Sequence, residues 1–237
     1  RMIFSDPFRG LGGMGRSSAE FIAVWWAAHY LESLESTIQL KQIYLDYLNL
    51  SRKGSGLFRP SGVDLLAQCV GGGLLHLNCH KNARGSVLSW PFQQMEVLLF
   101  HTQTHCSTAE HVSMLSEIPE ALMVPVRAGL DAFQSADQTK FLSAIQAFVK
   151  AQAAAGLIAD YSLSLIERLQ KLPGVLVAKG CGAMGADVIL VCCEVDAVAS
   201  LMAEGFNMGL LPITTYSNQV SGAEMFQLDR SEQRQVI

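Results

Sequence analysis

The sequence has few charged residues and no basic cluster. Only 16% of its 237 residues are Asp, Glu, Lys or Arg, against about 25% in a typical globular protein. The 17 basic and 21 acidic side chains leave a formal net charge of −4, which excludes a nucleic-acid binder that relies on a basic surface. The hydrophobic fraction of 50% excludes a disordered chain, because such chains have few apolar residues and high charge.

Long apolar runs and metal-binding cysteine pairs are also missing. No run reaches the roughly 18 apolar residues that a membrane-spanning helix needs, and the most apolar stretch, residues 21–30, is interrupted by His29. The six cysteines form no C-x-x-C pair, so they indicate neither a zinc site nor a disulfide framework. Free thiols without a secretory signal favour a cytoplasmic protein.

The spacing of apolar residues predicts an α+β protein. Residues 17–34, 37–50 and 65–70 are predicted as helices, and 74–77 and 95–101 as strands separated by a polar loop. From residue 118 the pattern predicts three helices, two strands, a helix and a strand; these lie at about 118–130, 141–149, 157–169, 175–179, 187–192, 196–204 and 207–213. We divide the chain near Glu117 into two units, residues 1–117 and 118–237.

The start of the chain also shapes the prediction. A short strand is predicted at residues 2–4, and a glycine-rich turn follows within ten residues of Arg1. A single strand cannot form a sheet. We therefore expect that its partners come from later in the chain or that an N-terminal segment is missing.

A glycine-rich segment, P-F-R-G-L-G-G-M-G-R-S-S-A, covers residues 7–19 and leads into a predicted helix. Glycines let the backbone approach an anion, and a helix N-terminus offers unpaired N–H groups. The residues expected to hold phosphates are Gly10, Gly12, Gly13, Gly15, Ser17 and Ser18, with the two serines also as ligands of Mg²⁺. The glycine-rich segment is not a Walker A loop, because no Gly-Lys-Ser/Thr follows. The alternative is a tight turn.

Two further segments contain candidate functional residues. Residues 60–64, P-S-G-V-D, end in Asp64, which could accept or orient a proton beside a phosphate site or cap its own turn. Residues 177–188, V-A-K-G-C-G-A-M-G-A-D-V, join two apolar strands. Small residues at this join indicate close packing or a tight hairpin.

In this order, the three segments resemble the motifs of the GHMP kinase superfamily, and most of all those of mevalonate and phosphomevalonate kinases. The first is similar to P-x-x-x-G-L-G-S-S-A, with Arg16 inserted before the paired serines. The second matches the P-S-G-V-D of mevalonate kinases, whose Asp is the catalytic base. The third is similar to G-A-G-G-G, with Ala183 and Met184 in place of glycines.

The resemblance implies a two-lobed GHMP kinase fold. Residues 1–117 would form a partial N-terminal ATP-binding lobe, and residues 118–237 a C-terminal ferredoxin-like α+β lobe. The implied cofactors are ATP and Mg²⁺, with Asp64 as the catalytic base and Gly182 and Gly185 in the nucleotide site. Several strands before the first motif would be missing. The family's glutamate ligand of Mg²⁺ would be absent or supplied by Glu32 or Glu35.

The implied activity is transfer of the γ-phosphate of ATP to mevalonate or phosphomevalonate in isoprenoid synthesis. P-S-G-V-D favours mevalonate, whereas the third motif and residues 107–108 favour phosphomevalonate. The alternative is a truncated or degenerate homologue that binds a ligand or a partner without turnover. The expected partners are a small-molecule substrate and either a second copy of the chain or the missing segment. Neither nucleic acid nor a membrane is expected as a partner. No metal site is expected at His101, His105 and His111.

Overall fold

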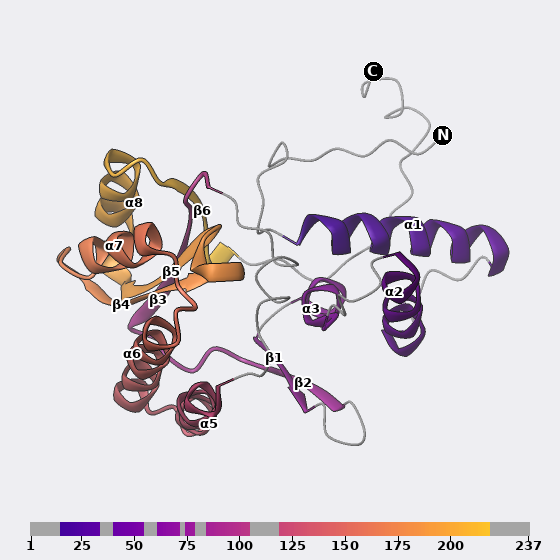
Figure 1. Ribbon diagram of the computed structural model, residues 1–237, viewed down its shortest axis with the longest axis horizontal. Coiled ribbons are helices and arrows are strands. Elements are labelled where there is room, and N and C mark those ends of the chain that lie inside the picture. The colour runs from indigo at the N-terminus through magenta and orange to yellow at the C-terminus, as the bar shows by residue number, and fades with distance from the viewer. Residues whose placement is uncertain are drawn as a thin grey trace.

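A computed structural model describes residues 15–33, 40–54, 61–71, 74–78, 84–104 and 119–218. The predicted strand at residues 2–4 and three of the candidate phosphate-binding glycines, Gly10, Gly12 and Gly13, lie outside these ranges. The described residues form a helical N-terminal part and a C-terminal part built on a sheet (Figure 1). No helix among them is long and apolar enough to cross a membrane.

Three helices and a hairpin make up the N-terminal part. The helices are α1 (Arg16–Ser33), α2 (Leu40–Gly54) and α3 (Val63–Val70), close to the predicted ranges. The strands β1 (Leu74–Asn78) and β2 (Arg84–Leu88) pair in antiparallel fashion. The prediction of a polar loop after β1 was therefore wrong at β2. Its sequence, R-G-S-V-L, has little apolar alternation, so pairing with β1 defines this strand.

The helices of the N-terminal part enclose a small apolar core. Its buried members are Ile22, Trp25, Trp26, Ile43, Leu65 and Cys69. The indole Nε1 of Trp25 donates a hydrogen bond to Oδ2 of Asp46 at 2.8 Å, which joins α1 to α2. Contacts of α3 with both α1 and β1 connect this core to the hairpin.

The C-terminal part is a four-stranded antiparallel sheet in the order β4-β5-β3-β6. Its strands are β3 (Met95–His101), β4 (Val175–Cys181), β5 (Val188–Glu194) and β6 (Leu211–Thr215). Its helices are α5 (Glu120–Gln134), α6 (Gln138–Ala154), α7 (Asp160–Leu169) and α8 (Val198–Asn207). Without the α5–α6 pair, the order β3-α7-β4-β5-α8-β6 is ferredoxin-like, as expected.

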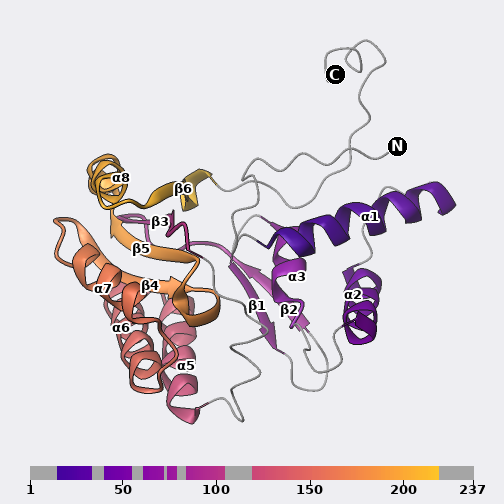
Figure 2. The ribbon, with the colours of Figure 1, turned by 45° about the horizontal axis from the view of Figure 1, so that its top comes forward.

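Helices cover both faces of this sheet (Figure 2). Leu98 and Phe100 of β3 belong to a core cluster that includes residues of α7 and α8. Met95 and Val97 face the other way and belong to a cluster with Phe133 of α5. This double coverage explains why β3 has a nearly continuous apolar sequence rather than an alternating one.

The pairing of β3 bears on the division of the chain. The expected division near Glu117 would place β3 in the N-terminal lobe, yet its two neighbours, β5 and β6, come from beyond residue 118. We propose that the two lobes divide between β2 and β3, because this keeps each sheet within one lobe.

Candidate active site

The first turns of α1 and α3 meet at one hydrogen bond. Ser18 of α1 donates from Oγ to Oδ2 of Asp64 of α3, across 46 residues of sequence. Ser18 is fully buried, whereas Asp64 is exposed. One oxygen of the Asp64 carboxylate is therefore held from the protein side while the group remains open to solvent.

Asp64 does not cap its own helix. The N-cap of α3 is Gly62, which has no side-chain capping bond and adopts a left-handed conformation with φ of 69°. A Cβ atom at Gly62 would lie 2.6 Å from Cε2 of Tyr44, so both the conformation and the space require glycine here. The P-S-G-V-D spacing thus places Asp64 in the first helical turn, facing Ser18.

Gly15 forms the turn that leads into α1. Its φ is +66°, and its carbonyl oxygen accepts hydrogen bonds from the backbone N–H of Ala19 at 3.0 Å and from Nε2 of Gln68 at 2.9 Å. Gln68 lies on α3, so it fixes the turn before α1 to the helix that bears Asp64. Sequence reasoning missed Gln68, because no local signal marks a glutamine whose partner is 53 residues away.

Arg16, where the sequence departs from the motif that it resembles, is the first residue of α1, and the Ser18–Asp64 hydrogen bond forms two residues after it. Its Nε lies 2.9 Å from Oε1 of Glu20 in an i,i+4 ion pair between two side chains that are each about half exposed. The next residue, Ser17, is exposed, and Ser18 after it is buried. The two candidate serines therefore face different surroundings.

Exposed oxygen atoms at this junction suit a hard cation. Mg²⁺ prefers hydroxyl, carboxylate and phosphate oxygens, and Ser17 and Asp64 offer such atoms to solvent. Ser18 fits less well as a direct ligand, because it is fully buried. The described residues include no group of three or more His, Cys, Asp or Glu that could hold a metal ion. The side chain of Glu32 and all of Glu35 lie outside what the structure describes, so their proposed role stays a prediction.

The third motif forms the turn between β4 and β5. A short 3₁₀ helix spans Ala183–Gly185, and Gly182 and Gly185 have φ of 80° and 59°. Gly180 approaches so closely that a Cβ atom there would lie 2.5 Å from Cα of Gly185. The turn lies at the end of the sheet on the side of the N-terminal helices (Figures 1 and 2). The structure thus brings Gly15, Ser18 and Asp64 together and places Gly182 and Gly185 in the other lobe.

His101 is a buried residue with a hydrogen-bond partner nearby in the chain. It is 2% exposed, and its Nδ1 accepts a hydrogen bond from the backbone N–H of Gln103 at 2.8 Å. His105 and His111 lie outside the described residues.

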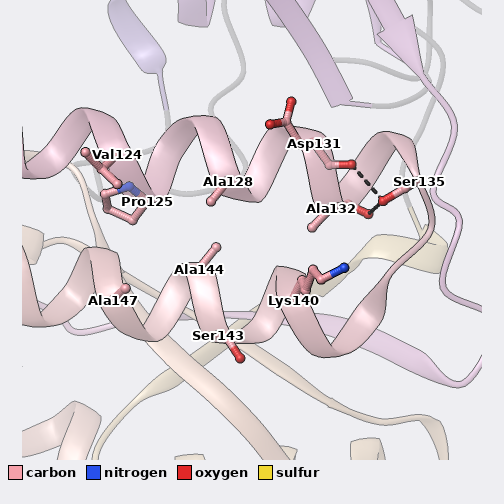
Figure 3. A pocket seen from close by; sticks show the side chains of 10 residues that line it. All are labelled: Val124, Pro125, Ala128, Asp131, Ala132, Ser135, Lys140, Ser143, Ala144 and Ala147. Carbon is pink, nitrogen blue, oxygen red and sulfur yellow. Dashed lines mark hydrogen bonds between the residues drawn. The ribbon is translucent and has the colours of Figure 1, made fainter.

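A groove of about 550 Å³ lies between α5 and α6 (Figure 3), two helices that lie away from α1 and α3 (Figures 1 and 2). Alanines, Val124 and Pro125 form most of its lining, and its charged members are Asp131 and Lys140. Lys140 is paired with Asp137 at 2.9 Å. None of the residues expected from the sequence motifs lines this groove, and it offers no constellation suited to catalysis.

No protein-family model matches the sequence, and no curated protein matches it. Solved structures do match the fold. The mevalonate kinase of L. major in complex with R-mevalonate is 16% identical with a TM-score of 0.66, over 89% of this chain and 67% of that one. The Lactococcus lactis galactokinase complexed with galactose is 14% identical with a TM-score of 0.68, over 92% and 68%.

A third match is the Streptococcus pneumoniae phosphomevalonate kinase in complex with phosphomevalonate and AMPPNP. It is 16% identical with a TM-score of 0.67, over 89% of this chain and 69% of that one. The chain spans about two thirds of the length of each of these three kinases. The α+β architecture that the motifs implied is confirmed: the chain has the fold of the GHMP kinases.

Proposed function

We propose that this protein is an ATP-dependent phosphotransferase that acts on a small molecule at the junction of α1 and α3. The observation that carries the proposal is the Ser18–Asp64 hydrogen bond, because it joins two segments that the sequence singles out independently. The fold supports the same class of reaction, since the matched structures include kinases of mevalonate, galactose and phosphomevalonate.

The N-terminus of α1 would bind the phosphates. The first N–H groups of a helix have no carbonyl partner within it, and they lie at the positive end of the helix dipole. The turn at Gly15 brings the chain into this position, and Gly10, Gly12 and Gly13 would extend the cradle. Mg²⁺, bound with ATP, would offset the phosphate charge beside the hydroxyl group of Ser17, which leaves the carboxylate of Asp64 for the acceptor.

Asp64 would act on the acceptor. With Oδ2 held by Ser18, its carboxylate can accept the proton of a hydroxyl group as the oxygen attacks. Ser18 keeps the carboxylate in place, and Gly182 and Gly185 would contribute to the nucleotide site from the other lobe.

The proposed acceptor is mevalonate or phosphomevalonate. Mevalonate offers a hydroxyl group, for which a base is useful, whereas phosphomevalonate offers a phosphate that is already ionised at neutral pH. The exposed carboxylate of Asp64 suits the first case, so we place mevalonate first.

The test is acceptor-dependent ADP formation. The chain would be incubated with ATP and Mg²⁺ plus mevalonate, phosphomevalonate, homoserine or galactose in turn. We expect turnover with mevalonate or phosphomevalonate and none without an acceptor. Turnover with homoserine or galactose alone would keep the reaction class and overturn the proposed substrate.

A binding role without turnover is the second candidate. The observation that favours it lies in the turn between β4 and β5, where Met184 stands in place of a glycine of the third motif. Met184 has φ of 55°, a conformation that is costly for a residue other than glycine. In that case ATP with Mg²⁺ would raise the unfolding midpoint of the protein by mass action, and no acceptor would elicit ADP formation.

A further inference from the structure

The hydroxyl group of Tyr47 contacts the same serine that holds Asp64. Tyr47 lies on α2, which contributes nothing to the three sequence motifs, and its hydroxyl oxygen is 3.4 Å from Oγ of Ser18. A serine hydroxyl has one proton to donate, and Ser18 donates it to Asp64. In its contact with Tyr47, Ser18 must therefore accept, and Tyr47 donates.

The ring of Tyr47 is held by the two helices that carry the pair. Phe21 of α1 packs edge-on against it, with ring centroids 5.1 Å apart and planes at 68°. Tyr47 also packs against the core cluster that includes Leu65 and Cys69 of α3. The direction of the hydroxyl group is thus set by the same α1–α3 junction that brings Ser18 to Asp64.

We propose that Tyr47 is a positioning residue for Asp64 and acts through Ser18. Its hydroxyl group directs the proton of Ser18 toward Oδ2 of Asp64, which gives the relay Tyr47–Ser18–Asp64. Donation to one hydroxyl group polarises it and strengthens the bond that it donates in turn. The inference rests on the proposed function for the role of Asp64 in turnover, but the relay itself is a property of the folded chain.

The size of the effect follows from the geometry. At 3.4 Å the Tyr47–Ser18 contact is longer than the usual 2.5 to 3.0 Å of an O–H···O bond, so it contributes less than a short one. Loss of the hydroxyl group should therefore lower turnover several-fold, and not by the larger factor expected for Asp64 itself.

The first test compares Tyr47→Phe with Tyr44→Phe in the full chain. Tyr44 lies on the same helix, and its hydroxyl group donates to the carbonyl oxygen of Ser61 at 3.2 Å, so each variant removes one hydroxyl group from one hydrogen bond. We expect Tyr47→Phe to lower kcat by about three- to ten-fold with KM for ATP unchanged, because the change is in positioning and not in nucleotide binding. Tyr44→Phe should lower stability and leave kcat within about two-fold. Equal losses in the two variants, or an unchanged kcat in Tyr47→Phe, would overturn the proposal.

The second test does not depend on activity. Unfolding equilibrium constants would be measured for Tyr47→Phe, Asp64→Ala and the double variant. Tyr47 and Asp64 share the partner Ser18. The effects of Tyr47→Phe and Asp64→Ala on the unfolding equilibrium constant should therefore be non-additive by about three-fold or more. The coupling should disappear in a Ser18→Ala background and be absent for Tyr44→Phe with Asp64→Ala.

These outcomes separate the two claims. Additive effects of Tyr47→Phe and Asp64→Ala would overturn the relay even in an active enzyme. Intact coupling in a chain that turns over none of the four acceptors would instead support the relay and count against the proposed function.

Discussion

At the scale of single residues, Ser17 and Ser18 show how one position along a helix changes a role. Successive residues on an α-helix are turned by about 100°, so Ser18 faces α3 and is buried while Ser17 faces solvent. The sequence motif presents the two serines as a pair. In the folded chain only Ser18 holds Asp64, and only Ser17 is open to a phosphate or a cation.

The Asp64 carboxylate gives the most direct prediction at this scale. Asp64→Asn keeps the size of the side chain but removes its charge, so with mevalonate we expect turnover to fall by about a hundred- to ten-thousand-fold, the usual contribution of a general base. The rise in unfolding midpoint on adding ATP with Mg²⁺ should change little. Rates of ADP formation and thermal unfolding would be measured together.

Asp160→Asn is the matched control, because Asp160 is an exposed aspartate in the first turn of α7. It should leave turnover unchanged. Near-normal turnover of Asp64→Asn with mevalonate would remove Asp64 from the mechanism. A smaller loss with phosphomevalonate is expected, because a phosphate acceptor needs no base.

The turn at Gly15 gives a second residue-scale prediction, tested against Gly156. Both glycines have positive φ, +66° and +67°, but a Cβ atom at Gly15 would lie 2.2 Å from Nε2 of Gln68, and one at Gly156 would meet nothing within 4 Å. Each change to alanine should cost about 1 kcal/mol from the left-handed backbone. Gly15→Ala should also displace Gln68 and weaken the ATP–Mg²⁺ response. Urea unfolding and thermal shifts measure both effects, and equal behaviour of the two variants would contradict this account.

At the scale of elements, close approach of a helix to the sheet depends on a glycine in α8. A Cβ atom at Gly205 would lie 2.3 Å from Cε1 of Phe100 on β3, whereas a Cβ atom at Gly129 of α5 would lie at an ordinary 3.5 Å from Cβ of Ala144. Phe100 is fully buried, so its ring has little room to move. The two helical glycines should therefore respond to the same substitution with opposite signs.

We expect Gly205→Ala to lower the free energy of unfolding by about 1 to 3 kcal/mol through overpacking. Gly129→Ala should raise it by about 0.5 to 1 kcal/mol, because alanine restricts the unfolded chain and favours a helix. Urea unfolding curves for the two variants give both values. A gain in stability with Gly205→Ala would show that α8 is not held this tightly against β3.

The start of α6 gives a pH-dependent prediction. The side chain of Asp137 accepts a hydrogen bond from the backbone N–H of Lys140 at 3.0 Å, and this bond and the Lys140 ammonium hold the pKa of Asp137 below its ordinary value of 3.8. A carboxyl group with a lowered pKa in the folded state contributes stability above its unfolded pKa, and this is lost as the pH falls through the folded pKa.

Asp137→Ala should therefore lower the unfolding midpoint at pH 7, and its difference from the wild type should shrink as the pH falls below about 3.8. Asp137→Asn should retain most of the capping at pH 7, because asparagine is also a good N-cap residue. Urea unfolding from pH 7 to pH 3 provides the comparison. A difference between wild type and Asp137→Ala that is constant across this range would show that the charge of Asp137 does not contribute.

At the scale of the whole molecule, each of the three core clusters contains one buried cysteine. Cys69 lies in the core of the N-terminal helices, and Cys193 and Cys192 lie on opposite faces of the four-stranded sheet. Burial raises the pKa of the Cys69 and Cys193 thiols to about 11, and that of Cys192 to about 12. Because the thiolate is the reactive form, all three should react slowly in the native protein.

Thiol labelling across a urea series therefore reports how the molecule unfolds. Of the four cysteines that the structure describes, we expect Cys181, which is partly exposed, to be labelled first at pH 8. Cys192 and Cys193 should become reactive at one urea concentration, because they are neighbours on β5. Cys69 should become reactive at a lower urea concentration than Cys192 and Cys193, because the N-terminal core has fewer buried residues than the two clusters on the sheet together. Separate midpoints for Cys192 and Cys193, read by fragmentation mass spectrometry of the peptide that contains both, would contradict the single cooperative sheet.

The sequence by itself determined where most helices and strands form and which fold they build. Apolar spacing located α1, α2 and the strands β3, β4 and β5 to within a few residues, because these patterns are local and repeat with the period of the element. The order of the three motifs implied the GHMP kinase fold, which is confirmed. The strand β2 was missed, since its residues carry little pattern and its pairing with β1 makes it a strand.

Tertiary structure alone decided how the site is assembled. The contacts of Ser18 with Asp64, of Gln68 with Gly15 and of Tyr47 with Ser18 span 46, 53 and 29 residues. No local pattern encodes such distances, because each contact depends on how α1, α2 and α3 pack around their shared core. The same packing exposes Ser17 to solvent and brings Ser18 to Asp64, because the position of α3 decides which face of α1 is buried.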